Sequence, residues 1–179
     1  MTHDSDLTSL IRTIPDFPKP GVMFRDITTL LKNAEGFHAA IERLAAAQAG
    51  RAIDKVVGIE SRGFIVGAAL ACRLELGFVP IRKKGKLPAE NFGEDYALEY
   101  GRDRLEMHRD AIERGERVLL VDDLIATGGT AEAAARLILT AGGSLTGCAF
   151  VIDLPDLGGR RRLEALGIPV QVLCRFSGH

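Results

Sequence analysis

The chain has 179 residues, 46% of them hydrophobic and 26% charged, with a formal net charge of −1. This length suits one globular domain, and the composition excludes disordered, fibrous and disulfide-rich classes of protein. The near-neutral charge gives no reason to expect binding to nucleic acid or to an anionic membrane surface. We therefore expect a single domain spanning residues 1–179.

From residue 33 onward, helical patterns alternate with short apolar runs. A helix is predicted after Asn33, because Phe37, Ile41 and Leu44 recur at helical spacing and the pattern ends at Gly50. The later predicted strands are residues 56–59, 77–81, 118–121, 146–153 and 170–174, and the later predicted helices are 63–74, 130–141 and 157–166.

The predicted strands are continuously apolar, which is typical of strands covered on both faces. Their alternation with helices predicts an α/β fold, an open and mainly parallel twisted sheet with helices on both faces. Residues 14–28, with several prolines, and residues 83–101, which are polar and punctuated by glycine, interrupt this pattern. Loops of this length usually act as lids or binding segments.

The three cysteines and the N-terminal segment favour a cytoplasmic location. Cys72, Cys148 and Cys174 are far apart and lack CxxC spacing, so we interpret them as reduced core thiols and expect no metal site built by the protein. The first ten residues contain no apolar signal-peptide core. The longest uncharged stretch, residues 137–152, is shorter than the roughly 20 residues that a membrane-spanning helix needs.

The candidate ligand site follows the strand predicted at residues 118–121. Asp122 and Asp123 end this strand, and residues 126–130 (Ala-Thr-Gly-Gly-Thr) lead into a helix. Ligands of α/β sheets bind at the carboxyl edge, and a glycine-rich turn at a helix N-terminus binds phosphate. Neighbouring carboxylates accept hydrogen bonds from vicinal hydroxyls or hold a hydrated divalent cation. The pattern indicates a sugar phosphate, with a receiver domain as the weaker alternative.

Residues 118–130 (VLLVDDLIATGGT) resemble the phosphoribosyl pyrophosphate (PRPP) motif of type I phosphoribosyltransferases. Segments similar to the adenine-specific members of this family occur in the family's order, namely DFPKPGVMFRDI (16–27), GIESRGF (58–64), VPIRKKGKLP (79–88) and YALEYG (96–101). The similarity begins near residue 14 and continues to the end of the chain.

The resemblance implies a fold and an activity. The sheet would carry an N-terminal hood at about residues 1–30 and a flexible β-hairpin lid at about residues 84–101. The enzyme would serve purine salvage, transferring the 5-phosphoribosyl group of PRPP to N9 of adenine and forming AMP and pyrophosphate. Mg²⁺ would be bound mainly through substrate oxygens and water, because this ion keeps several waters and prefers substrate phosphates to protein cages. Family members are homodimers, in which Arg82 could reach the neighbouring site.

The resemblance also assigns residues to PRPP and to catalysis. Asp122 and Asp123 would bind the ribose hydroxyls and stabilise the positive charge of an oxocarbenium-like transition state. Glu99 of the lid would handle the purine proton. The 5′-phosphate would be bound by Ala126, Thr127, Gly128, Gly129 and Thr130. Other PRPP contacts would come from Glu60, Ser61, Arg62, Arg82, Lys83, Lys86 and Tyr100, with a cis peptide between Glu60 and Ser61.

The hood would bind adenine. Met23 and Arg25 would read the base edge mainly through backbone groups, Phe24 would stack on the ring, and Leu154 would pack on the other face. Acceptors facing the 6-amino group would reject a 6-oxo purine.

Each assignment has a structural alternative in the sequence alone. Ser61 could simply cap a helix, Met23 and Phe24 could be core residues, and Glu99 could be an exposed acid in a hairpin of residues 97–100 and 104–107. The basic run at residues 82–86 contains no acid and could be a solvated loop, as we favour for residues 160–162.

Two other functions stay open as well. One is a regulator that binds PRPP without turnover, and the other is an enzyme of the same fold that uses hypoxanthine, guanine or orotate.

Overall fold

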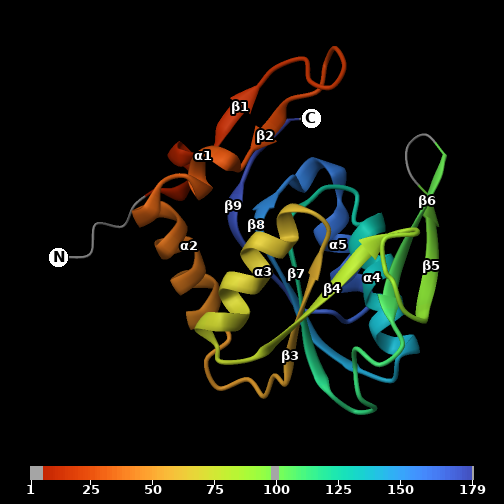
Figure 1. The fold of residues 1–179 in the computed structure, drawn as a ribbon. Coiled ribbons are helices and arrows are strands. Elements are labelled where there is room, and N and C mark those ends of the chain that lie inside the picture. Colours follow the sequence, from red (N-terminus) through yellow and green to blue (C-terminus); the bar gives the residue numbers. More distant parts are fainter. Residues whose placement is uncertain (1–5, 98–100, 179) are drawn as a thin grey trace.

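The computed structural model describes residues 6–97 and 101–178 (Figure 1). Within these residues, a seven-stranded sheet has the order β5-β6-β4-β3-β7-β8-β9. The strands from β4 to β9 in this order pair in parallel, and β6 and β5 add an antiparallel hairpin at the β4 edge. The main strands are β3 (Lys55–Ile59), β4 (Gly77–Lys83), β5 (Asn91–Ala97), β6 (Arg102–His108), β7 (Arg117–Ile125), β8 (Ser144–Asp153) and β9 (Val170–Arg175). The predicted open, mainly parallel sheet is confirmed.

Helices cover both faces of this sheet (Figure 1). The helices are α1 (Thr28–Leu31), α2 (Ala34–Ala46), α3 (Arg62–Arg73), α4 (Gly129–Thr140) and α5 (Gly159–Ala165). Strand β7 shows why two layers are needed, since Leu119 packs in the core with α2 and α3 while Leu120 packs in the core with α4 and α5. Successive side chains of a strand point to opposite faces, so an uninterrupted apolar run must be covered twice.

Strand β7 is longer than its sequence predicts. It continues past the acidic pair to Ile125, because Leu124 and Ile125 still pair with Ile152 and Asp153 of β8. Asp122 and Asp123 therefore lie inside the last part of a strand and do not follow its end.

The polar segment predicted as a loop at residues 83–101 contains β5, so that prediction was wrong for residues 91–97. The strand forms because β6 supplies its hydrogen-bonding partner over the whole length, from Asn91 opposite His108 to Ala97 opposite Arg102. Its apolar side chains Phe92 and Tyr96 pack on the α4 side of the core. The hairpin also begins earlier than residues 97–100, where the sequence placed it.

The hood consists of a two-stranded sheet, β1 (Arg12–Ile14) with β2 (Phe24–Asp26), and the loop between them. An ion pair between Arg12 and Asp26 joins the two strands. The hood contacts the far end of the chain, where an Nη of Arg25 donates a hydrogen bond to the carbonyl oxygen of Ser177 at 3.0 Å. The hood and the β5–β6 hairpin thus lie at opposite ends of the large sheet (Figure 1).

The described part of the chain contains no helix that is both long and apolar enough to cross a membrane.

Candidate active site

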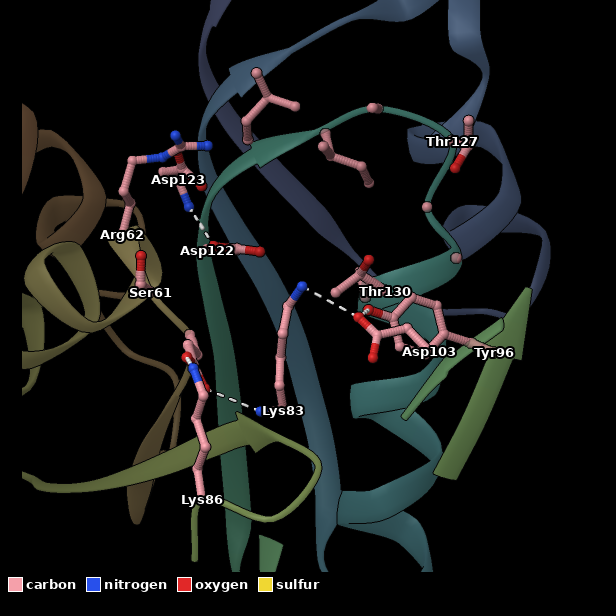
Figure 2. A pocket seen from close by; sticks show the side chains of 17 residues that line it. Ser61, Arg62, Lys83, Lys86, Tyr96, Asp103, Asp122, Asp123, Thr127 and Thr130 are labelled. Atoms are coloured by element: carbon pink, nitrogen blue, oxygen red, sulfur yellow. Dashed lines mark hydrogen bonds and ion pairs between the residues drawn. The ribbon is translucent and has the colours of Figure 1, made fainter. Parts of the chain in front are cut away.

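A cavity of about 580 Å³ opens at the carboxyl ends of the central parallel strands (Figure 2). It lies between the N-termini of α3 and α4 and is closed on one side by the β5–β6 hairpin. The residues that line it are Glu60, Ser61, Arg62, Lys83, Lys86, Tyr96, Asp103, Asp122, Asp123 and the continuous segment 124–131. The structure therefore brings together four segments that the sequence analysis singled out separately.

Residues 126–130, called the cradle below, form the turn from β7 into α4. Gly128 is the N-cap residue of α4 and has φ 82°, a left-handed conformation that glycine adopts without steric cost. A Cβ atom on Gly128 would lie 2.9 Å from Cα of Gly159, so the neighbouring chain also excludes a side chain. Gly159 in turn donates its backbone N–H to the carbonyl oxygen of Ala126 at 2.9 Å. The glycines let the backbone N–H groups at this helix N-terminus face the cavity, where they can bind an anion.

The two adjacent acids point in different directions (Figure 2). Asp122 faces the cavity, and its Oδ1 accepts a hydrogen bond from the backbone N–H of Asp123 at 2.8 Å. Asp123, which is 6% exposed, pairs with Arg62, whose Nε lies 2.5 Å from Oδ2. Desolvation raises the pKa of Asp122 well above its usual range, and the negative charge of Asp123 raises it further.

Glu60 organises the basic loop that follows β4. The sequence shows no acid within the run 82–86, but folding brings Glu60 to two of its cationic groups and to the backbone of a third basic residue. Lys86 forms an ion pair with Glu60 Oε1, the backbone N–H of Lys83 donates to Oε2 at 2.9 Å, and Arg82 Nε lies 3.5 Å from Oε2. Burial tends to raise the pKa of Glu60, but the hydrogen bonds from Lys86 and Lys83 outweigh it and lower the pKa. The Glu60–Ser61 peptide is cis, as the resemblance implied.

Ser61 precedes α3, but its side chain makes no capping hydrogen bond there. The alternative that Ser61 simply caps the helix through its side chain is therefore wrong. Arg82 is not among the cavity-lining residues of the described chain; one of its Nη groups donates to the carbonyl oxygen of Lys86 at 3.2 Å.

Sequence reasoning missed two residues of the cavity wall, Tyr96 and Asp103 from the two hairpin strands. The Tyr96 hydroxyl donates to Asp103 Oδ2 at 3.2 Å, and Lys83 Nζ lies 3.1 Å from the same oxygen (Figure 2). The hydrogen bond and charge of Asp103 raise the pKa of Lys83. The sequence did contain a signal for Asp103. Strand residues two apart share a face, so this acid lies on the same face as the apolar residues Leu105 and Met107.

The hood residues predicted to bind adenine lie beside this cavity and, in the described chain, do not line it. The ring of Phe24 lies 5.6 Å from Cζ of Arg62, which connects the hood to the acidic pair. Met23 is 37% exposed, so the core alternative for this residue is wrong. The Arg25 side chain turns to Thr13 and Ser177, and Leu154 is 9% exposed within the core beneath. Glu99 and Tyr100, predicted in the lid, lie outside the described residues.

Comparison with known proteins agrees with this geometry. Residues 27–169 match the phosphoribosyl transferase domain family. The adenine phosphoribosyltransferase of Brucella ovis is 63% identical over 96% of this chain and 95% of its own length. The chain belongs to the adenine phosphoribosyltransferases.

Solved structures of family members share the fold. The adenine phosphoribosyltransferase of Rhodothermus marinus superposes with a TM-score of 0.90 at 56% identity, covering 95% of this chain and 96% of the other. The Saccharomyces cerevisiae enzyme superposes with a TM-score of 0.88 at 41% identity, covering 94% of this chain and 96% of the other. That yeast enzyme was crystallised with adenine and D-2,5-dideoxy-2,5-imino-altritol 1,6-bisphosphate.

Proposed function

We infer that this chain transfers the 5-phosphoribosyl group of PRPP to N9 of adenine, forming AMP and pyrophosphate. It is a purine salvage enzyme of the glycosyltransferase class. The observation that carries this conclusion is the position of Asp122 and Asp123 directly beside the cradle in one cavity, within a chain of this family.

PRPP binding divides between two ends of the cavity. The cradle binds the 5′-phosphate through its backbone N–H groups and the hydroxyls of Thr127 and Thr130, supported by the positive end of the α4 dipole. Three cations at the other end supply countercharge to pyrophosphate, namely Arg62, Lys83 and Lys86, each of which forms an ion pair with an acid of the cavity wall. The loop of Glu60 and Ser61 adds backbone donors. Arg82 and Tyr100 complete the proposed set.

The acidic pair supports the chemical step. Asp122 and Asp123 accept hydrogen bonds from the ribose 2′- and 3′-hydroxyls, between the cradle and the basic loop. As the bond from C1 to pyrophosphate breaks, positive charge develops on the sugar, and carboxylates stabilise that charge more than the ground state. Arg62 holds Asp123 in place at 2.5 Å.

Mg²⁺ fits the donor set of this cavity only as an ion shared with the substrate. No group of three or more His, Cys, Asp or Glu side chains in the described chain could hold a metal alone. Asp122 and Asp123 supply carboxylate oxygens that can contact a hydrated ion, the ligand type that Mg²⁺ prefers. When bound, the ion supplies neutralisation of the pyrophosphate oxygens.

The hood binds adenine next to Arg62. Phe24 stacks on the ring, Met23 and Arg25 present backbone groups to its edge, and Leu154 lies on the other side. The 5.6 Å approach of Phe24 to Arg62 supports this placement, because it brings the hood to the sugar end of the cavity. The yeast family member crystallised with adenine supports the choice of base.

Glu99 is proposed as the group that handles the purine proton. We predict that Glu99→Gln slows the single-turnover rate by about 100-fold or more, within the usual range for loss of a general acid or base, while PRPP affinity stays nearly constant. Rapid-quench kinetics measure the first quantity and equilibrium titration the second. An unchanged single-turnover rate would remove Glu99 from the mechanism.

We further propose a cytoplasmic homodimer in which each chain works as one domain, with a hood at about residues 1–30 and a lid at about residues 84–101. Support for the dimer comes from α3, where Ile65 is 46% exposed and Ala68 and Cys72 extend an apolar stripe one and two turns further along. Cys148 and Cys174 are buried, but Cys72 is exposed, so the prediction of a core position was wrong for Cys72. The three unpaired cysteines suit a reducing compartment.

A competition assay tests the function directly. Purified protein is mixed with PRPP, Mg²⁺ and equal amounts of adenine, hypoxanthine, guanine and orotate, and the products are identified by mass spectrometry. We expect AMP and pyrophosphate alone, and neither after chelation of the metal. Another nucleotide would overturn the assignment of the base, and PRPP binding without any product would favour a regulator.

A further inference from the structure

An ion-pair network lies against the cradle, and its role rests on the proposed 5′-phosphate site. Glu132 is in the first turn of α4 and is 9% exposed. Its Oε1 accepts a hydrogen bond from Arg136 on the same helix, and its Oε2 accepts one from Arg162 of α5. Arg136 also donates to Glu94 of β5 at 3.2 Å. The network thus joins α4, α5 and the hairpin.

Arg162 is exposed, as the sequence favours for residues 160–162, but it also makes an ion pair between two helices. Arg160 does pair with Glu164 along its own helix, at 2.8 Å. The side chain of Arg162 is 50% exposed and reaches across to Glu132 of α4. The difference arises because α5 begins against the cradle, where Gly159 donates to the carbonyl oxygen of Ala126 at 2.9 Å.

The guanidinium of Arg162 lies beside the proposed phosphate donors. A Cβ atom on Gly129 would be 3.9 Å from Nη1 of Arg162 and 4.0 Å from Oγ1 of Thr127. Among the described residues, neither Nη group of Arg162 has a hydrogen-bond acceptor, whereas its Nε is bound to Glu132. A positive charge is therefore fixed next to the backbone of the cradle.

Glu132 makes this charge necessary. Its carboxylate is nearly buried in the first turn of the helix whose N-terminus would bind a phosphate dianion, so water screens their repulsion only weakly. Arg136 is shared between Glu132 and Glu94, so the four-residue network is neutral with Arg162 and would carry one net negative charge without it. We propose that Arg162 is a positioning residue for the 5′-phosphate, because it neutralises Glu132 and keeps the cradle attractive to anions.

The test compares ligands with and without a 5′-phosphate. Arg162→Met should lower the affinity for AMP and ribose 5-phosphate by about tenfold in calorimetric titration, and should raise the KM for PRPP similarly. A change of this size is expected when one positive charge close to the phosphate is lost. The affinities for adenosine and pyrophosphate and the kcat should stay within about twofold. Arg160→Gln removes the same charge from the same helix and should leave all ligands unchanged.

Charge rescue separates electrostatics from packing. Glu132→Gln in the Arg162→Met background should restore AMP affinity to within about twofold, and Glu132→Gln alone should tighten AMP binding, since it removes the repelling charge. The single Glu132→Gln variant keeps the proposal testable even if Arg162→Met fails to fold. Failure of the rescue, or equal losses for AMP and adenosine, would overturn the role of Arg162.

Gly128→Ala separates this proposal from the one beneath it. If this cradle variant leaves AMP and ribose 5-phosphate affinity unchanged, the 5′-phosphate site itself is misplaced. If Gly128→Ala lowers the affinity for both ligands while Arg162→Met does not, only the proposed role of Arg162 is overturned.

Discussion

At the scale of single residues, Asp123 is held by Arg62 with its carboxylate almost fully removed from water. Asp123→Asn preserves the shape of the side chain but removes the charge that would stabilise the sugar in the transition state. We expect kcat/KM to fall by about 100-fold or more, the usual loss for one electrostatic group, with an unchanged circular dichroism spectrum.

The control for this variant is Glu35→Gln, which makes the same charge change at an exposed position in the first turn of α2. It should keep wild-type kinetics. Wild-type kcat/KM in Asp123→Asn would remove that carboxylate from the active site.

The neighbouring Asp122 carries a cost to stability. Its pKa in the native state is raised by desolvation and by Asp123, so the native state resists ionisation more than the unfolded chain does. Below about pH 4 the carboxyl is protonated in both states and costs nothing. As the pH rises above that value, Asp122 ionises first in the unfolded chain, which favours unfolding. The native state therefore loses stability until the pH passes the raised pKa that Asp122 has in the native state.

We therefore predict that Asp122→Asn is more stable than the wild type at neutral pH and inactive. The Tm should rise by about 2–4 °C for each kcal/mol recovered, and the gain should vanish as the pH approaches 4. Calorimetry across this pH range measures it. A lower Tm at pH 7, or a gain that persists at pH 4, would contradict a destabilising ionisation of Asp122.

At the scale of elements, the turn from β7 into α4 depends on Gly128. Alanine there would occupy a left-handed conformation, at about 1–2 kcal/mol, and its Cβ would meet the backbone of Gly159 at 2.9 Å. Gly128→Ala should lower stability by about 2 kcal/mol or more and raise the KM for PRPP at least tenfold, measured by denaturant unfolding and initial rates.

Gly115 provides the matched control. It also has a positive φ, of 86°, but a Cβ there would meet nothing within 4 Å. Gly115→Ala should therefore show the conformational cost alone, with an unchanged KM for PRPP. Equal KM changes in the two variants would mean that the cradle has no special role.

At the scale of the whole molecule, the exposed stripe of α3 starts at Ile65, about one turn after the loop of Glu60 and Ser61. Ile65→Asp places a charge in the proposed interface, where burying it unpaired is costly, so the dimer should dissociate to monomers. Sedimentation velocity measures this. Leu139→Asp on α4, at a side chain that is 57% exposed, should remain dimeric, and a dimeric Ile65→Asp would move the interface elsewhere.

The order of helices and strands follows from the sequence because it depends on local patterns. The helix start at Asn33, the apolar strands and the glycine–threonine turn each depend on residues close together in the chain. The acidic pair and the cradle are neighbours in sequence, so their meeting in one cavity was also predictable. The limits of β5 and β7 could not be predicted in this way, because each strand ends where its pairing with a neighbour ends. Strand β5 pairs with the polar strand β6, and β7 pairs with β8, which follows only after α4.

Long-range charge pairing was decided by the tertiary structure alone. Glu60 meets the basic loop across 22 residues or more, Asp103 meets Lys83, and Arg162 crosses from α5 to Glu132. Charged side chains carry no periodic signal that names a partner, so a run of cations looks the same in sequence whether it is solvated or paired. Only the packing of α5 on the cradle and of the hairpin on β4 brings these charges within reach of one another.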